Sequence, residues 1–194
     1  MPFIDIEWKD GQDNMPGTVG DVKFIPTSQA DISGVTVDDD GVTLLGDIAI
    51  KSGGRINNIY ATDRSGNATD ENQGDIDGSY SENTLTWMIP GSFKDQESYK
   101  RKVRNTRGIY LFRDSDFNWR VIGIWAAQNP KYTEGGEEPM YIASLEKPAY
   151  TAPSGTQGAS GGDRRGATIT VTSDAPHGAL FYDGDIPVNP PPPA

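Results

Sequence analysis

The chain has 194 residues, enough for one domain with a substantial hydrophobic core and extended arms. Its formal net charge of −11 argues against direct wrapping of nucleic acid, because phosphate binding draws on clustered Lys and Arg. It has no cysteine, which excludes disulfides, thiolate metal sites and a cysteine nucleophile. No apolar run approaches the roughly 18 residues of a membrane span, and the first residues lack a basic signal-peptide start. We therefore expect a soluble protein made in the cytoplasm.

Gly and Pro number 23 and 14, and hydrophobic residues make up 35% of the chain, which favours turns and short strands over long helices. Apolar alternation indicates the first strands at Phe3–Trp8, Val22–Pro26, Val42–Ile50 and Arg55–Thr62. Ser52-Gly53-Gly54 predicts a hairpin between the last two. Leu85, Trp87 and Ile89 share one face of a further strand that ends at Pro90.

One helix is predicted, at about residues 92–106. Ser92 can cap its first turn, and Asp95 occupies the capping-box position. Phe93, Tyr99 and Val103 fall on one side, which predicts that this side packs on the rest of the domain.

Five further strands follow the helix, at Gly108–Arg113, Asn118–Ala126, Met140–Glu146, Ala167–Ser173 and Ala179–Tyr182. About nine or ten strands with one helix are typical of a β-sandwich or barrel flanked by a helix. The strand periodicity predicts as core residues Trp87, Ile109, Leu111, Ile122, Ile124, Ile169 and Val171.

Composition divides the chain into an N-terminal arm (1–20), a β-domain (21–183) and a Pro-rich C-terminal tail (184–194). Within the domain, 61–80 is predicted to be a long polar loop and 152–162 a Gly/Ser linker.

Few residues suggest catalytic chemistry. The single histidine, His177, lies in a Pro- and Gly-rich turn, where an exposed histidine is a bystander more often than a general base. The Gly-rich stretch before Arg164 and Arg165 matches neither a dinucleotide fingerprint nor a phosphate loop. No carboxylate pair stands out as an acid and a base. We expect no enzymatic activity, no cofactor and no metal.

Alternate oxygen side chains in Asp114–Asn118 raise the question of a cation loop. Trp119 stands where an EF-hand loop needs Gly, and Ala126 stands where it needs an acid. Asp, Ser and Asn also favour turns by hydrogen bonding to their own backbone. A hairpin tip joining two core strands is therefore the preferred interpretation.

Positive charge is concentrated around the predicted helix. Ser92–Arg107 contains six bases and two acids, a net of +4, so that the rest of the chain carries −15. A solvated helix face with bases near its C-terminal end explains this pattern. A subunit interface, in which the basic helix of one copy meets acidic loops of the next, explains it equally well.

The order of features resembles the tail tube proteins of long-tailed bacteriophages, the major tail protein family. The resemblance rests on "NMPGTVGDVKFIPTSQADI", "GGRINNIYATD", "ENQGDIDGSYSENTLTW", the helix, "GIYLFRDSDFNWRVIG" and "SGGDRRGATITVTSDAP", and it spans nearly the whole chain. It implies a β-sandwich or barrel with one flanking helix, in homohexameric rings whose inner sheets form a continuous lumen. Rings stack through a long loop, here 61–80, and terminal arms. The Pro-rich tail matches no family feature.

The resemblance also implies a virion location, with baseplate and terminator proteins as further partners and no membrane. DNA would pass through the tube without specific binding. An acidic wall is expected, because a basic wall would retain phosphates. Asp47, Asp75 and Asp77 are the lumen candidates. The inter-subunit candidates, expected outside the lumen, are Lys100, Arg101 and Arg104.

Two alternatives come from other classes. A carbohydrate-binding or virion adhesion module would also be β-rich and acidic, with a stacking platform drawn from Trp87, Trp119, Trp125 and Tyr182. The alternation of Trp87 and Trp125 with apolar neighbours favours core burial instead. A hydrolase with paired carboxylates is the enzyme alternative.

Overall fold

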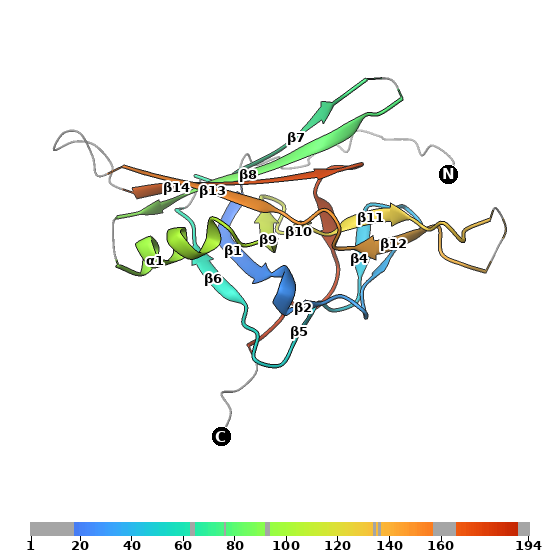
Figure 1. Ribbon diagram of the computed structural model, residues 1–194, viewed down its shortest axis with the longest axis horizontal. Coiled ribbons are helices and arrows are strands. Elements are labelled where there is room, and N and C mark those ends of the chain that lie inside the picture. Colours follow the sequence, from blue (N-terminus) through green and yellow to red (C-terminus); the bar gives the residue numbers. More distant parts are fainter. Residues whose placement is uncertain are drawn as a thin grey trace.

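A computed structural model of the chain describes residues 18–62, 65–75, 77–91, 94–133, 135, 137–156 and 166–189. These residues form two principal β-sheets that face each other, with one helix on a flank (Figure 1). The sequence-based fold class, a mostly β sandwich with a single flanking helix, is confirmed.

The larger sheet has seven strands in the order β3-β4-β15-β10-β9-β1-β6. They are β3 (Thr36–Val37), β4 (Thr43–Leu45), β15 (Leu180–Tyr182), β10 (Trp119–Ile122), β9 (Gly108–Asp114), β1 (Thr18–Pro26) and β6 (Asn57–Tyr60). Only β15 and β4 pair in parallel within it.

The second sheet has four antiparallel strands in the order β13-β14-β8-β7. They are β13 (Tyr150–Thr156), β14 (Gly166–Ala175), β8 (Tyr80–Pro90) and β7 (Asn67–Gln73). Two small ribbons pair β2 (Ala30–Asp31) with β5 (Ala49–Ile50), and β11 (Trp125–Gln128) with β12 (Tyr141–Ser144). A 3-10 turn, η1 (Thr27–Gln29), follows β1, and the helix α1 spans Lys94–Val103.

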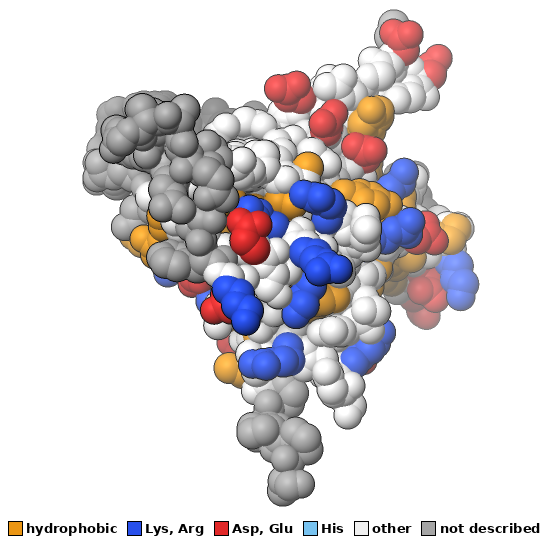
Figure 2. Space-filling model, turned by 60° about the vertical axis from the view of Figure 1, so that its left-hand side comes forward, with side chains coloured by type: hydrophobic (Ala, Val, Ile, Leu, Met, Phe, Trp, Pro, Cys, Tyr) orange, Lys and Arg blue, Asp and Glu red, His pale blue; other side chains and the backbone are white. Residues whose placement is uncertain are grey.

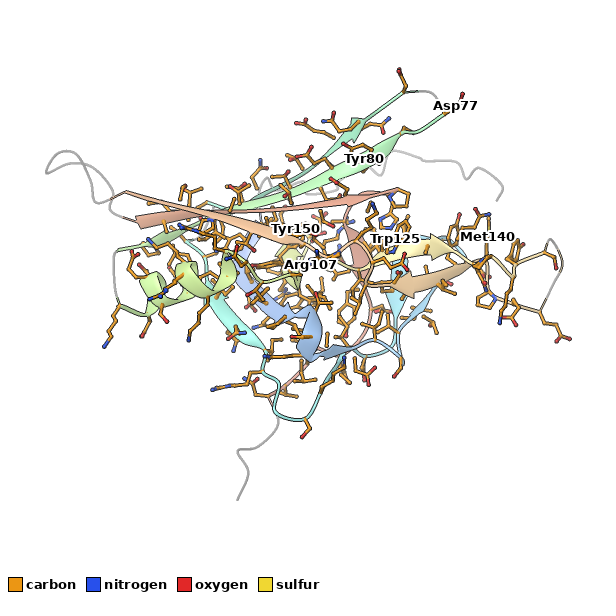
Figure 3. All side chains as sticks on the ribbon, in the orientation of Figure 1. Asp77, Tyr80, Arg107, Trp125, Met140 and Tyr150 are labelled. Carbon is orange, nitrogen blue, oxygen red and sulfur yellow. The ribbon has the colours of Figure 1, made fainter. Side chains whose placement is uncertain are left out.

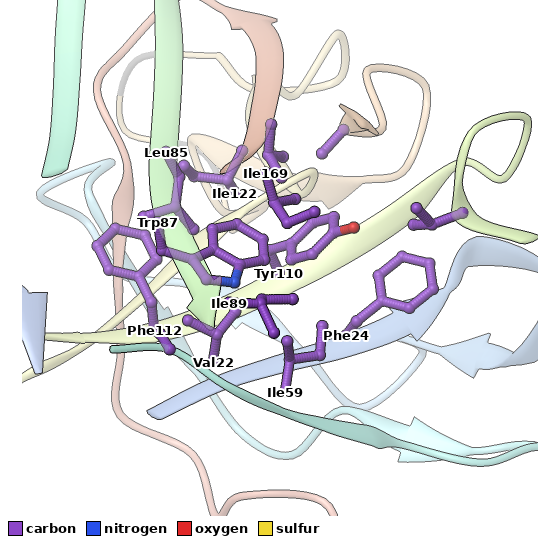
Figure 4. Packing of buried hydrophobic residues seen from close by; sticks show 14 of the residues in the cluster. Val22, Phe24, Ile59, Leu85, Trp87, Ile89, Tyr110, Phe112, Ile122 and Ile169 are labelled. Atoms are coloured by element: carbon purple, nitrogen blue, oxygen red, sulfur yellow. The ribbon is translucent and has the colours of Figure 1, made fainter. Parts of the chain in front are cut away.

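All seven core residues predicted from the sequence are buried, none of them more than 3% exposed. Between the sheets, Leu85 and Trp87 of β8 meet Ile169 of β14 and Tyr110 and Phe112 of β9 (Figure 4). A second hydrophobic cluster lies on the other face of the larger sheet. The larger sheet is thus covered on both faces, whereas the second sheet contributes one face to the core.

Three hydroxyl groups tie the helix to both sheets. Tyr99 of α1 approaches Tyr110 of β9, with 3.2 Å between the two Oη atoms, and Tyr110 Oη lies 2.6 Å from Thr151 Oγ1 of β13. Burial raises the pKa of Tyr110 to about 12, so its hydroxyl remains protonated at neutral pH. Val103 is 2% exposed and packs in the same cluster as Tyr99, as predicted for this side of the helix, whereas Phe93 lies outside the described residues.

Two strand assignments made from the sequence are wrong. The segments 42–50 and 55–62 do not form a hairpin, because β5 pairs with β2 and β6 pairs with β1. The predicted strand at 118–126 is two strands, β10 and β11, separated at Gly123. The φ of Gly123 is +99°, and a Cβ there would lie 2.3 Å from the carbonyl oxygen of Gly108. This close approach requires glycine, and the chain leaves the sheet at that point.

Two polar segments are more ordered than expected. The predicted loop 61–80 contains β7, which pairs with β8 along its whole length. The predicted linker 152–162 begins inside β13, and its residues 157–162 lie outside the described part of the chain. Strand β7 has no apolar alternation because both of its faces are exposed, so the usual pattern of a half-buried strand is missing.

The helix, the N-terminal arm and the C-terminal tail have limits that differ from those predicted from the sequence. The helix is shorter than residues 92–106, and Ser92 lies outside the described residues. Of the N-terminal arm, 18–20 belong to β1 and the rest is not described, which includes the predicted strand 3–8. Of the C-terminal tail, 184–189 are described. There Asn189 binds the backbone of Ile56, accepting from its N–H at 2.7 Å and donating to its carbonyl at 3.2 Å.

Replacing Ile122, 3% exposed, by Asp is expected to abolish cooperative folding, because an unpaired carboxylate between the sheets loses its hydration without a partner. The matched variant Ile142→Asp changes a side chain that is 40% exposed and should keep the fold. Thermal unfolding followed by circular dichroism measures both. A cooperative transition of wild-type midpoint in Ile122→Asp would contradict the packing described.

Candidate interaction surfaces

The outer face of the second sheet is rich in threonine. Side chains that alternate with the buried ones of β8 and β14 point outward, among them Thr84, Thr86, Thr168, Thr170 and Thr172. None of the four strands contains Lys or Arg, and the acids on this face are Glu71 of β7, Glu82 of β8 and Asp174 of β14. The strands of this face therefore carry no positive side chain, although Lys147, just before β13, lines a hollow together with Thr172 and Asp174.

Acidic residues face one another across three strands of this sheet. Glu82 of β8 is the register partner of Glu71 of β7 on one side and of Asp174 of β14 on the other. Directly opposed residues share a face, and like charges placed so are destabilising. The sheet therefore carries an electrostatic cost at this end.

The edge strands of the second sheet are β7 and β13. Within the described residues, no strand pairs with the outer edge of β7 or of β13, apart from single bridges at Gly66 and Ala149 just before them. Unpaired N–H and C=O groups along such edges are templates for a strand from another chain.

The structure separates the three lumen candidates. Asp75 and Asp77 lie in the turn between β7 and β8, at the end of a hairpin that projects beyond the sandwich (Figure 3). Asp47 lies between β4 and β5, where its Oδ1 accepts a hydrogen bond from the N–H of Asp185 at 2.8 Å. The sequence did not predict Glu71, Glu82 and Asp174 as acids of the outer face of the second sheet. Glu71 falls in the predicted loop 61–80, whereas Glu82 and Asp174 lie just beyond the apolar alternation that marks β8 and β14. Predicting that these acids share a face requires the register of the strands, and the polar sequence of β7 gives no indication of that register.

The inter-subunit candidates lie on α1 but differ in exposure. Arg101 and Arg104 are exposed, whereas the Lys100 side chain is 16% exposed and pairs with Glu97 one turn earlier. Bases gather over this flank of the molecule (Figure 2). Arg107, just after the helix, lies over the ring of Tyr150, with its Cζ 5.6 Å from the ring centroid.

The Asp114–Asn118 tip is a hairpin turn, as its residue types predicted. Asp114 Oδ1 accepts from the N–H groups of Asp116 and Asn118, and Phe117 adopts a φ of +66°. The other carboxylate oxygen of Asp114 pairs with Arg120 Nε at 3.1 Å. Both oxygens of Asp114 therefore have partners in the folded chain.

A groove of about 450 Å³ lies beside this turn, between β7 and the larger sheet. Arg120 enters its wall, with its guanidinium 3.3 Å above the ring centroid of Phe181 and one N–H donated to the carbonyl of Ala179. Asp70 of β7 lines the other side. The stacking and the two polar contacts hold Arg120 in place as a structural link between β10 and β15.

The aromatic platform considered for a carbohydrate-binding module is not assembled. Trp87 and Tyr182 are 1% and 5% exposed. Tyr182 Oη accepts a hydrogen bond from the Ile48 N–H and donates one to the Asp185 carbonyl. Trp119 and Trp125 are half-buried on different strands, β10 and β11. The expectation of core burial holds for Trp87 and only in part for Trp125.

His177 is a structural residue rather than an exposed bystander. It is half-buried, and its Nε2 accepts a hydrogen bond from the N–H of Ala126 at 2.9 Å. Its Nδ1 lies 2.7 Å from the Gly178 carbonyl, a contact that this tautomer makes as a donor. Burial lowers the pKa of His177. The neutral ring thus connects the turn after β14 to β11.

Within the residues that the structure describes, no group of three or more His, Cys, Asp or Glu side chains could hold a metal ion. None of the described helices has the length and apolar character needed to cross a membrane.

No protein-family model, curated protein or solved structure matches the chain.

The hydrogen bonds of His177 predict a pH dependence of stability. Because its folded pKa lies below the value of 6.5 for a free histidine, the unfolded chain binds the proton more strongly. The contribution of His177 is fully present above that value and is lost as the pH falls through the folded pKa. Between about pH 7.5 and about pH 5, the thermal midpoint of the wild type should fall more than that of His177→Gln, which keeps an acceptor but does not titrate. Equal slopes for the two proteins would contradict this role.

Proposed function

We propose that the chain is a virion structural protein, a tail tube subunit that assembles into stacked hexameric rings around a passage for phage DNA. Two observations support the proposal. The sequence resembles the tail tube family in the order of its features, and the fold has the sandwich and single flanking helix that this family implies.

The main support for the proposal comes from the edges and the outer face of the second sheet. Within the described residues its two edges have no strand partner along their length, and its four strands contain neither Lys nor Arg. Pairing the β7 edge of one copy with the β13 edge of the next would satisfy both edges and join the sheets of successive copies into one continuous wall. The covered larger sheet would then lie outside, because both of its faces are already packed.

Threonine hydroxyls and acids suit the wall of a DNA passage. DNA that moves through a narrow bore is retained when Lys and Arg side chains of the wall bind its phosphates. Each such side chain occurs once in every copy of the ring, so the number of phosphate contacts grows with the number of copies. Under this proposal Glu71, Glu82 and Asp174 face the lumen, with Asp75 and Asp77 at its rim. Asp47 belongs to the segment between β4 and β5 and would lie on the outer side, so we no longer propose it for the lumen.

Purified protein tests the proposal directly. Light scattering should give a species of six times the 21.0 kDa chain mass, and negative-stain microscopy of concentrated protein should show rings or tubes. A monomer at every concentration would overturn the proposal. Glycan binding by such a monomer would favour the carbohydrate-binding alternative.

The lumen assignment predicts how a single added lysine changes DNA binding. Thr168 is exposed on the outer face of the second sheet, and Thr36 is exposed on β3 of the larger sheet. Assembled Thr168→Lys protein should bind short duplex DNA at about 50 mM salt and release it at about 0.5 M, since counterion release governs phosphate binding. Assembled Thr36→Lys and wild-type protein should bind little. Co-sedimentation measures retention, and equal retention by both variants would contradict the assignment.

A further inference from the structure

The two edge strands of the larger sheet, β3 and β6, differ in length (Figure 1). Within the described residues, no strand pairs with the outer side of either one. Strand β3 has two residues, and a very short edge strand offers little template to another chain. Strand β6 has four residues, Asn-Asn-Ile-Tyr, with neither a charge nor a proline to discourage pairing. The edge at β6 is therefore the one that needs a cover.

The backbone groups along the outer side of β6 can be identified from its first neighbour. Asn189 binds both backbone groups of Ile56, the residue just before β6, so Ile56 directs them away from β1. Strand β6 runs antiparallel to β1, and in such a pair the N–H and C=O of alternate residues point to the same side. Asn58 and Tyr60 therefore direct their backbone groups to the side that Asn189 occupies.

Tyr60 adds an aromatic ring at the far end of this edge. Its side chain is 63% exposed, whereas the preceding Ile59 is 8% exposed and packs in the core between the sheets. Exposed aromatic rings are the surfaces on which proline-rich segments dock. The outer side of β6 thus combines two N–H donors with a surface suited to proline.

The chain that follows Asn189 fits this edge in chemistry and in length. Residues 190–193 are four consecutive prolines. Such a run favours the polyproline II conformation and carries carbonyl acceptors but no N–H donor. In that conformation the step from residue 189 to 193 covers about 12 Å, and the step from Ile56 to Tyr60 along a strand covers about 13 Å. A proline run anchored at Ile56 therefore reaches Tyr60.

We propose that residues 190–193 lie along the β6 edge of the same chain and cover it. Their carbonyl oxygens accept hydrogen bonds from the N–H groups of Asn58 and Tyr60, and their rings pack on the Tyr60 side chain. The covered edge is closed to strands of other chains, because prolines present no N–H on their far side to continue a ladder. Pairing between copies is then directed to the edges of the second sheet.

Hydrogen exchange of the β6 amides tests this edge cover on the full-length chain. The variant Pro190→Ser/Pro191→Ser/Pro192→Ser/Pro193→Ser loses the fixed proline conformation, and exchange in the peptide that covers residues 57–61 should become about tenfold faster. Asn189→Ala removes the anchor and should change this peptide in the same direction. Val188→Ser is the matched control, because that side chain is 86% exposed and lies next to the anchor. Mass spectrometry measures the exchange, and the peptide that contains β9 reports on the core.

Faster exchange in β6 with unchanged exchange in β9 supports the edge cover. Equal β6 exchange in the wild type and the four-proline variant overturns it, and so does an equal acceleration in the Val188→Ser control. Wild-type protection that disappears on dilution also overturns it, because the cover would then come from a second copy. The measurement is made on dilute chains and needs no ring, so the proposed tube function stands or falls separately.

Discussion

The burial of β9 on both faces is the constraint on which the rest of the structure depends. Tyr110 and Phe112 enter the core between the sheets, while Ile109 and Leu111 enter the cluster on the opposite side. A strand that serves two cores must be apolar at successive positions, and this one is. The two-sided larger sheet follows from it, and so does the division of the molecule into a covered sheet and a sheet with one exposed face.

The hydroxyl contacts of Tyr110 extend this constraint to the helix. Because Tyr110 reaches both Tyr99 of α1 and Thr151 of β13, the flanking helix is fixed relative to the edge strand of the second sheet. The charges of α1 are thus held at one end of that sheet and the acids of the β7–β8 hairpin at the other. The separation of basic and acidic residues to opposite ends of the sheet therefore results from the core packing.

The sequence predicted the fold where one face of an element is buried. Leu85, Trp87 and Ile89 alternate in β8 because their neighbours face outward, so the pattern was visible. It did not predict β7, which has no buried face, or the break at Gly123, which depends on the carbonyl of Gly108, distant along the chain. Of the candidate interaction surfaces, the sequence predicted the charge distribution: an acidic segment before β8 and a basic helix after it. The register that brings Glu71, Glu82 and Asp174 together depends on long-range pairing, which local pattern does not specify.

The attachment of Asn189 to Ile56 has a practical consequence for handling the protein. Its two hydrogen bonds fix the last described residue beside the connection that leads from β5 into β6, on the side of the molecule away from the second sheet (Figure 1). A fluorophore or affinity label introduced at the neighbouring Val188, which is 86% exposed, would keep these bonds and leave the strand edges and the threonine face of the second sheet unobstructed. Self-association could therefore be followed optically on labelled chains without the label occupying the contact under study.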